Sequence, residues 1–187
     1  MTYLVSDEWR EVVERELVPW CLEQAELGDH LLEIGPGPGL TTDALRRAVP
    51  HVTAVEVDPS LAAALAARLS GTNVRVVHAD ATDTGLPAAM FSSAACFTML
   101  HHVPTSEQQD QLFGEVCRVL RDGGVFIGID SLDSERIRRG HVDDVFNPVD
   151  PDTLGDRLRA AGFAEVAIER REDRVRFRAT RSGARAT

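Results

Sequence analysis

The stretch that decides the fold runs from His30 to Gly39 and reads HLLEIGPGPG. Its first half is a short apolar run, which is typical of a buried strand in a parallel sheet. Its second half has glycine at every other position, and glycines let a backbone turn sharply and approach a ligand closely. The stretch therefore predicts a strand, a tight loop and a ligand-binding edge of the sheet.

Strands and helices alternate on both sides of this stretch. We expect further strands at 51–58, 74–80, 93–99 and 125–130, and helices at 6–26, 40–49, 59–69, 107–120 and 152–161. Two more strands, at 164–169 and 174–179, are separated by a short turn, which can join only antiparallel strands. Residues 131–150 are predicted to be irregular. The pattern predicts an α/β fold with a seven-stranded, mostly parallel sheet that ends in an antiparallel hairpin.

Composition narrows the class of protein. The 187 residues, with a mass of 20.4 kDa, suffice for one domain with its own core. The net charge is −10 and every basic residue is arginine, which excludes a phosphate-binding or Schiff-base lysine and disfavours nucleic acid as a partner. The three cysteines are isolated, the N-terminus resembles no secretory signal, and no apolar run is long enough to cross a membrane. We therefore expect a cytoplasmic protein.

The glycine loop favours one kind of ligand. Glu56 follows Gly35 by 21 positions and ends the second predicted strand, where a carboxylate can accept both hydroxyls of a ribose. A dinucleotide loop would need a glycine at Leu40 and N–H groups for a pyrophosphate, which Pro36 and Pro38 lack. S-adenosylmethionine, which has ribose and adenine but no phosphate, fits better. A nicotinamide-dependent oxidoreductase and a tight turn without a ligand remain as alternatives.

On these residues, the chain from Leu31 to about Gly124 resembles the class I S-adenosylmethionine-dependent methyltransferases. The resemblance implies a three-layer, Rossmann-like sandwich over residues 28–181. The residue pattern adds a helical cap over residues 1–27 and predicts a disordered tail over residues 182–187. It also implies S-adenosylmethionine as cofactor and S-adenosylhomocysteine as product. The chain departs from the family at Ser92, because the fourth strand there often begins with Phe-Asp.

The resemblance also implies a cofactor site. The segment from Glu33 to Gly39 would surround the methionine moiety, Glu56 would bind the ribose, and the backbone of Thr98 and Met99 would border the methionyl end. Val57, Asp80 and Ala81 would contact the adenine. The full implied set is Glu33, Gly35, Pro36, Gly37, Gly39, Glu56, Val57, Asp80, Ala81, Thr98 and Met99. No metal site is predicted, because no ligand at suitable spacing joins His101 and His102.

The methyl acceptor is predicted to be a small molecule. The first half of the chain is also similar to the ribosomal RNA adenine dimethyltransferases, but the segment Thr98–His101 replaces the Asn-Leu-Pro-aromatic motif that grips adenine there. An arginine cluster near the last two strands could follow a phosphate backbone, but its alternation with apolar residues favours a solvated strand face. The cluster comprises Arg170, Arg171, Arg174, Arg176, Arg178, Arg181 and Arg185. RNA adenine methylation and non-catalytic binding of S-adenosylmethionine remain as alternatives.

His102 is the candidate general base, because it directly follows the fourth strand. The rival hypothesis is that His102 caps or packs against the helix that begins near Ser106, with His101 solvated. A base is needed only for a weakly acidic acceptor, since alignment of donor and acceptor supplies much of the catalysis. His141, Asp143 and Asp144 lie where the family builds acceptor contacts, and a surface loop is the equal alternative.

Overall fold

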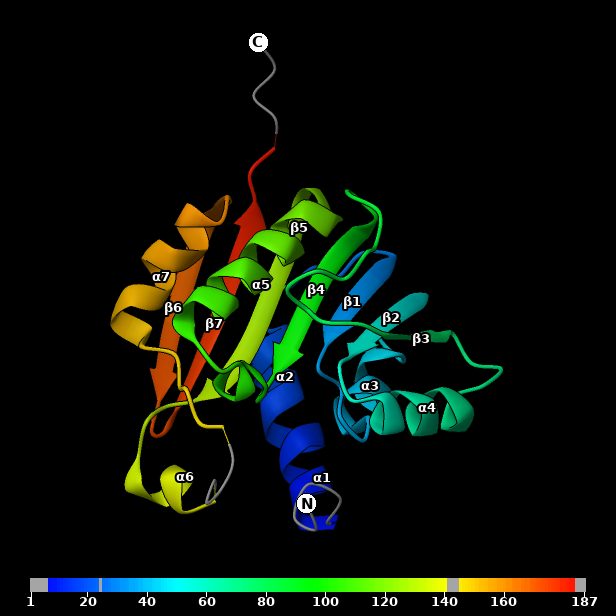
Figure 1. The fold of residues 1–187 in the computed structure, drawn as a ribbon, viewed down its shortest axis with the longest axis horizontal. Coiled ribbons are helices and arrows are strands. Elements are labelled where there is room, and N and C mark those ends of the chain that lie inside the picture. Colours follow the sequence, from blue (N-terminus) through cyan, green and yellow to red (C-terminus); the bar gives the residue numbers. More distant parts are fainter. Residues whose placement is uncertain (1–6, 24, 141–144, 184–187) are drawn as a thin grey trace.

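A seven-stranded sheet with the order β3-β2-β1-β4-β5-β7-β6 forms the centre of the protein (Figure 1). The computed structural model describes residues 7–23, 25–140 and 145–183. The strands are β1 (His30–Ile34), β2 (His51–Glu56), β3 (Val74–His78), β4 (Phe91–Phe97), β5 (Leu120–Ser131), β6 (Phe163–Arg171) and β7 (Arg174–Arg181). The α-helices are α1 (Asp7–Val12), α2 (Val18–Leu22), α3 (Leu40–Leu45), α4 (Pro59–Arg68), α5 (Ser106–Val119), α6 (Glu135–Gly140) and α7 (Pro151–Ala160), with a π-helical turn η2 (Val13–Leu17) and a 3₁₀ turn η3 (Leu100–His102). None of the described helices is long and apolar enough to span a bilayer.

The strand directions confirm the predicted topology. β3, β2, β1, β4 and β5 run parallel, whereas β7 is antiparallel to both β5 and β6. β5 begins earlier than predicted, because Leu120 pairs with Phe91 across a register shift in the β4–β5 ladder. The turn between β6 and β7 contains Glu172 at a φ of 49°, in the left-handed region that tight turns use.

Neighbouring residues of the central strands face two different apolar cores. Leu32 packs in a cluster with residues of α5 and α7, whereas Leu31 packs with residues of η2, α2 and α3, and both leucines are 0% exposed. Phe126 and Ile127 of β5 divide in the same way. Figure 1 shows the same layering, with α5 and α7 in front of the sheet and α2 behind it. The alternation of a strand thus produces the predicted three layers.

The N-terminal helical segment covers the arginines of the C-terminal hairpin. The guanidinium groups of Arg171 and Arg176 lie 4.5 Å and 5.2 Å from the centre of the Trp20 ring, and that of Arg174 lies 5.7 Å from the Trp9 ring. The prediction of a solvated strand face is therefore wrong for Arg174 and Arg176, whose side chains are only 21% and 16% exposed. The sequence pattern cannot show this contact, because it identifies the outward face of β7 but not the helix that covers it.

Ser92 stabilises the start of β4, where the family often has an acid. Its hydroxyl accepts a hydrogen bond from the N–H of His30 at 2.9 Å and donates one to the carbonyl of Leu27 at 2.7 Å. Serine here joins the starts of β1 and β4, so the departure from the family pattern leaves the sheet intact.

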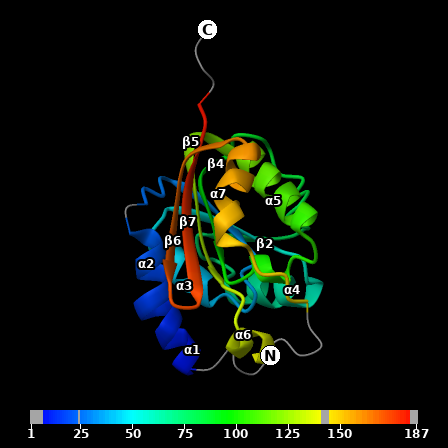
Figure 2. The ribbon, with the colours of Figure 1, turned by 90° about the vertical axis from the view of Figure 1, so that its left-hand side faces the viewer.

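The segment after β5 contains a short helix that the sequence analysis missed. Residues 131–150 were predicted to be irregular, but Glu135–Gly140 forms α6, with local ion pairs from Asp133 to Arg138 and from Glu135 to Arg139. Six residues are too few for an apolar periodicity to appear. Figures 1 and 2 show α6 and the start of α1 at the same end of the molecule, and the β4 arrow in Figure 1 points toward that end. His141, Asp143, Asp144 and Arg185 lie outside the described residues, as do Ser6 and residues 184–187 of the predicted tail.

Candidate active site

The glycine loop after β1, residues 35–39, uses all of its own N–H groups. The three glycine N–H groups donate to the Val55 carbonyl, the Glu56 carboxylate and the Pro36 carbonyl, each at 2.9 Å. The two prolines of the loop have no N–H. The φ angles of the glycines are 63°, 53° and 88°, a region that favours glycine. Residues 35–39 therefore offer no N–H group with which to cradle a pyrophosphate.

Glu56, at the end of β2, binds the backbone of this loop through its carboxylate. Its side chain is buried, and its two carboxylate oxygens accept hydrogen bonds from the N–H groups of Gly37 at 2.9 Å and Asp58 at 3.0 Å. Each carboxylate oxygen can accept a further hydrogen bond, so both can still bind hydroxyl groups of a ligand. The next residue, Val57, is 63% exposed and presents an apolar surface beside the carboxylate.

Glu33, near the end of β1, is a buried acid with an unsatisfied oxygen. One carboxylate oxygen accepts a hydrogen bond from the Thr41 hydroxyl at 2.5 Å, and Oε2 has no hydrogen-bond partner among the described residues. Burial raises the pKa of Glu33 from an ordinary 4.5 to about 7, against the lowering effect of the Thr41 and Thr42 hydroxyl groups. A cationic N–H donor beside Oε2 would satisfy this oxygen. Glu33 is therefore a buried carboxyl group with one hydrogen-bonding position left open.

The residues after β3 lie beside Glu56. The N–H of Ala79 donates to the Glu56 carbonyl at 3.1 Å, which fixes the end of β3 next to the end of β2. Asp80 is exposed and accepts hydrogen bonds from the N–H and the hydroxyl of Thr82, both at 2.8 Å, so its carboxylate is oriented locally. Ala81 is half-buried against the core.

Thr98 and Met99 directly follow β4, and Met99 contacts the glycine loop. Thr98 has a φ of 50°, and its N–H donates to the Ile129 carbonyl at 2.7 Å. Such a strained backbone in a non-glycine residue is concentrated at functional sites. A Cβ built on Gly35 would lie 3.1 Å from the Cβ of Met99, so the glycine lets the two loops touch.

The two histidines after β4 have different environments. His101 is 3% exposed, and its Nδ1 lies 2.5 Å from the carboxylate of Asp130, at the end of β5. The same carboxylate accepts hydrogen bonds from the N–H groups of Leu100 and Ser131, at 2.7 Å and 2.6 Å. His102 is exposed. The expectation of a solvated His101 in the rival hypothesis is therefore wrong. The sequence could not show this contact, because Asp130 lies 29 residues away along the chain.

Polar side chains extend this arrangement to the segment after α6. The Asn147 N–H donates to the His101 carbonyl at 2.7 Å, and the Gln109 side-chain amide donates to the Leu100 and Asn147 carbonyls at 3.0 Å and 2.8 Å. Thr105, and neither histidine, caps α5, by accepting from the N–H of Gln108. Asp130 could have been found by the reasoning that selected Glu56, since both acids end buried strands. Asn147 and Gln109 carry no sequence signal of this kind.

The structure thus places the predicted residues along one edge of the sheet. The loop of residues 35–39 contacts Glu56 through Gly37 and Met99 through Gly35. Glu33 is bonded to Thr41, just after the loop, and Asp80 and Ala81 follow the residue that binds the Glu56 carbonyl. His102 stands on the other side, next to the buried His101, with ring centres 4.2 Å apart. Among the described residues, no three acidic, histidine or cysteine side chains are grouped to hold a metal ion.

The sequence of this edge belongs to a known family. Residues 32–128, more than half of the chain, match the methyltransferase domain family. The chain is a member of that family. This membership confirms the resemblance drawn from the glycine loop and the ends of the second and third strands.

A sequence relative of this methyltransferase-family chain matches part of its length. It is 46% identical over 61 residues to the ribosomal RNA small subunit methyltransferase A of Acidithiobacillus ferrooxidans, a stretch that covers 33% of this chain and 23% of that protein. The chain thus spans about a quarter of the length of this curated relative.

Solved structures share the whole fold at low sequence identity. The PH0226 protein from Pyrococcus horikoshii OT3 superposes with a TM-score of 0.81 at 17% identity, covering 96% of this chain and 94% of that one. The Haemonchus contortus phosphoethanolamine N-methyltransferase 2 in complex with S-adenosyl-L-methionine superposes with a TM-score of 0.78 at 13% identity, covering 94% of this chain and 56% of that one. These structures confirm the Rossmann-like fold.

Proposed function

We propose that this protein transfers a methyl group from S-adenosylmethionine to a small-molecule acceptor. The observation that carries the proposal is the hydrogen bonding of the glycine loop. All of its N–H groups donate to protein acceptors, so the Glu56 carboxylate beside the loop is the group that can bind a ligand. Such a loop suits a ribose better than a pyrophosphate. When bound, the cofactor would supply an activated methyl group and leave as S-adenosylhomocysteine.

The proposed contacts follow the order of the strands. Glu56 binds the ribose hydroxyls, and Val57, with Asp80 and Ala81, binds the adenine. Glu33 is the buried acid on the ammonium side of the methionine moiety, and its Oε2 has no hydrogen-bond partner among the described residues. The backbone of Gly35, Pro36, Gly37, Gly39, Thr98 and Met99 shapes the walls around the methionine moiety.

Charge and arginine contacts support a small-molecule acceptor over RNA. The net charge of −10 opposes a phosphate backbone. The hairpin arginines are engaged within the protein: Arg176 pairs with Glu169 and Glu23, and Arg170 pairs with Asp152. Tight RNA binding that weakens steeply with salt, together with a methylated RNA product, would favour the ribosomal RNA alternative instead.

His102 is the proposed general base for an acceptor that must lose a proton. Its side chain is exposed at the acceptor side of the edge, whereas His101 and Asp130 hold the backbone from which it projects. A neutral imidazole can accept a proton from a polar acceptor group. We propose that His101 acts only in positioning this backbone, since its side chain is buried and its Nδ1 is held by Asp130.

The test begins with thermal melting in the presence of S-adenosylmethionine, S-adenosylhomocysteine or NAD. A ligand at 100 times its dissociation constant adds about 2.7 kcal/mol of apparent stability. We expect stabilisation by the first two ligands and none by NAD. Transfer of radiolabelled methyl into a metabolite pool then separates an enzyme from a binding protein. Stabilisation by NAD alone would contradict the proposal, and cofactor binding without transfer to any metabolite would favour the non-catalytic alternative.

A further inference from the structure

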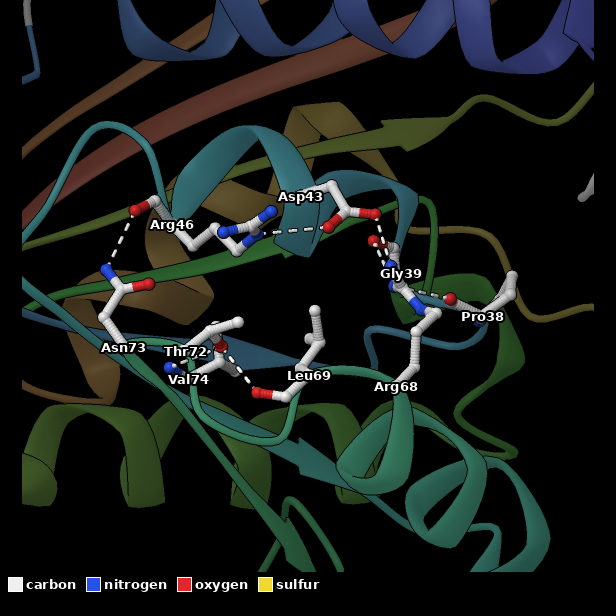
Figure 3. Close-up of polar contacts among 9 residues, drawn as sticks. All are labelled: Pro38, Gly39, Asp43, Arg46, Arg68, Leu69, Thr72, Asn73 and Val74. Atoms are coloured by element: carbon white, nitrogen blue, oxygen red, sulfur yellow. Dashed lines mark hydrogen bonds and ion pairs between the residues drawn. The ribbon is translucent and has the colours of Figure 1, made fainter.

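Arg68, which belongs to none of the sequence motifs, donates hydrogen bonds to the backbone of the glycine loop. Arg68 is the last residue of α4, and one of its guanidinium nitrogens donates to the carbonyls of Pro38 and Gly39, at 3.1 Å and 3.2 Å (Figure 3). Its other terminal nitrogen binds the Asp43 carboxylate at 2.6 Å. Arg68 thus fastens the end of the loop and the first turn of α3 to α4.

The close approach of Arg68 explains why residue 39 is glycine. A Cβ built on Gly39 would lie 2.4 Å from a guanidinium nitrogen of Arg68 and 2.4 Å from a methyl carbon of Leu65. The φ of Gly39 is 88°, a backbone angle that residues other than glycine rarely adopt. The third glycine therefore lets α4 lie against the loop and brings the arginine to its carbonyls.

Asp43 and Asn73 complete the support of α3. Asp43 also pairs with Arg46, and its own N–H donates to the Gly39 carbonyl at 3.1 Å. At the other end of α3, the Asn73 side chain donates to the carbonyl of Arg46 at 2.9 Å, as Figure 3 shows, and to that of Val49 at the same distance. The helix that follows the loop is therefore tied at both ends to the α4–β3 unit.

We propose that Arg68 is a positioning residue for the cofactor, one that keeps the Pro38–Gly39 backbone in its binding shape. The proposal rests on the proposed function of the loop. The loop N–H groups are satisfied within the loop and by β2, so Arg68 restrains the face that those contacts leave free. Hydrogen bonds from a charged guanidinium are stronger than neutral ones. Without the Arg68 hydrogen bonds, the loop would populate several conformations. The apparent affinity for the cofactor would then fall in proportion to the population of the binding conformation.

The test compares Arg68→Gln, Arg68→Lys and the control Arg47→Gln, which removes the same charge from an exposed arginine just beyond α3. Calorimetry measures the affinity of each protein for S-adenosylhomocysteine, and amide hydrogen exchange measures protection of the Gly39 N–H. We expect Arg68→Gln to weaken binding about tenfold or more and to speed exchange at Gly39 but not in β4. Arg68→Lys should recover part of the affinity, and Arg47→Gln should match the wild type.

Wild-type affinity in a folded Arg68→Gln variant overturns the proposal. Faster exchange throughout the sheet also overturns it, because the residue would then act on global stability alone. A wild-type protein that binds no S-adenosylhomocysteine overturns the proposed function as well, and this outcome is recognised before any variant is measured.

Discussion

The two sides of the candidate site are built in different ways. On the cofactor side, the backbone of one loop is held by carboxylates and an arginine from the next three elements along the chain, as in the bond from Gly37 to Glu56. On the acceptor side, side chains from separate segments meet: His101 with Asp130, and Gln109 with the Asn147 carbonyl 38 residues away. A loop held by local backbone contacts suits a cofactor that is the same throughout the family. Side chains from separate segments suit an acceptor that differs from one family member to another.

We expect the largest effect from a substitution on the acceptor side, Asp130→Ala, which should lower the free energy of unfolding. Asp130→Ala leaves His101 and the N–H groups of Leu100 and Ser131 without their shared acceptor. Removing one partner from a buried charged network costs about 3–5 kcal/mol, so the free energy of unfolding should fall by that amount in urea titrations. The control Asp133→Ala removes an exposed pair with Arg138 and should cost no more than about 0.5 kcal/mol. An Asp130→Ala variant as stable as the control would show that the network is not a structural unit.

Glu33 should make the stability of the cofactor side depend on pH. Its pKa is raised from 4.5 to about 7 in the folded protein, so the folded state holds the proton more tightly than the unfolded state. This contribution is full below pH 4.5 and is lost as the pH rises through about 7, with a total of up to about 3 kcal/mol. Relative to Glu33→Gln, the ligand-free wild type should lose stability between pH 5 and about 8 in denaturant titrations.

Cofactor binding gives the same prediction a second readout. A bound cation favours the ionised form of Glu33, so wild-type affinity should rise over this pH range, whereas that of Glu33→Gln should stay flatter. The control Asp156→Asn alters an acid that is 87% exposed and should follow the wild type. A pH-independent difference in stability between wild type and Glu33→Gln would contradict the assignment.

His102→Ala tests the acceptor side without disturbing its structure. Because the side chain is exposed, the free energy of unfolding should change by no more than about 0.5 kcal/mol. Turnover with the acceptor found by radiolabelled transfer should fall about 100-fold or more, with cofactor affinity unchanged. The control His51→Ala changes an exposed histidine at the start of β2 and should be silent. A fall of several degrees in melting temperature, with turnover per folded molecule retained, would support the packing hypothesis instead.

Glu56→Ala should weaken cofactor binding by about 2 kcal/mol, within a range of about 1–3 kcal/mol for a hydrogen bond to a charged group. The variant removes the proposed ribose acceptor and also the anchor of the Gly37 N–H. Glu56→Gln keeps one acceptor oxygen and should lose less. Calorimetry on folded protein measures both, and unchanged affinity in Glu56→Ala would remove the ribose assignment.

The smallest expected effect concerns Val57, which is 63% exposed without a ligand. Val57→Ser removes apolar surface that adenine would cover, and should weaken cofactor binding by about 1 kcal/mol. Val145, which is 41% exposed on the acceptor-side segment, supplies the matched control. Val145→Ser should leave cofactor affinity unchanged, and equal effects of the two substitutions would erase the distinction between the sides.

Much of the cofactor side could be predicted from the sequence, because backbone chemistry is local. The run from Leu31 to Ile34 predicts a strand buried on both faces, and all four residues are buried. Pro36 and Pro38 lack N–H groups in any fold, and the spacing from Gly35 to Glu56 is that of one βαβ unit. The hairpin at the C-terminus follows from the shortness of its turn, which only antiparallel strands can use.

Only the tertiary structure decided which side chains meet. The sheet order places β4 between β1 and β5, and this neighbourhood brings Asp130 to His101 and Met99 to Gly35. The same packing covers Arg176 with Trp20 and brings Arg68 to the carbonyls of the glycine loop. A sequence gives the period of a strand or helix and hence the direction in which a residue points. The partner across the gap depends on how elements far apart in the chain pack, because burial and hydrogen bonding there are properties of the assembled layers.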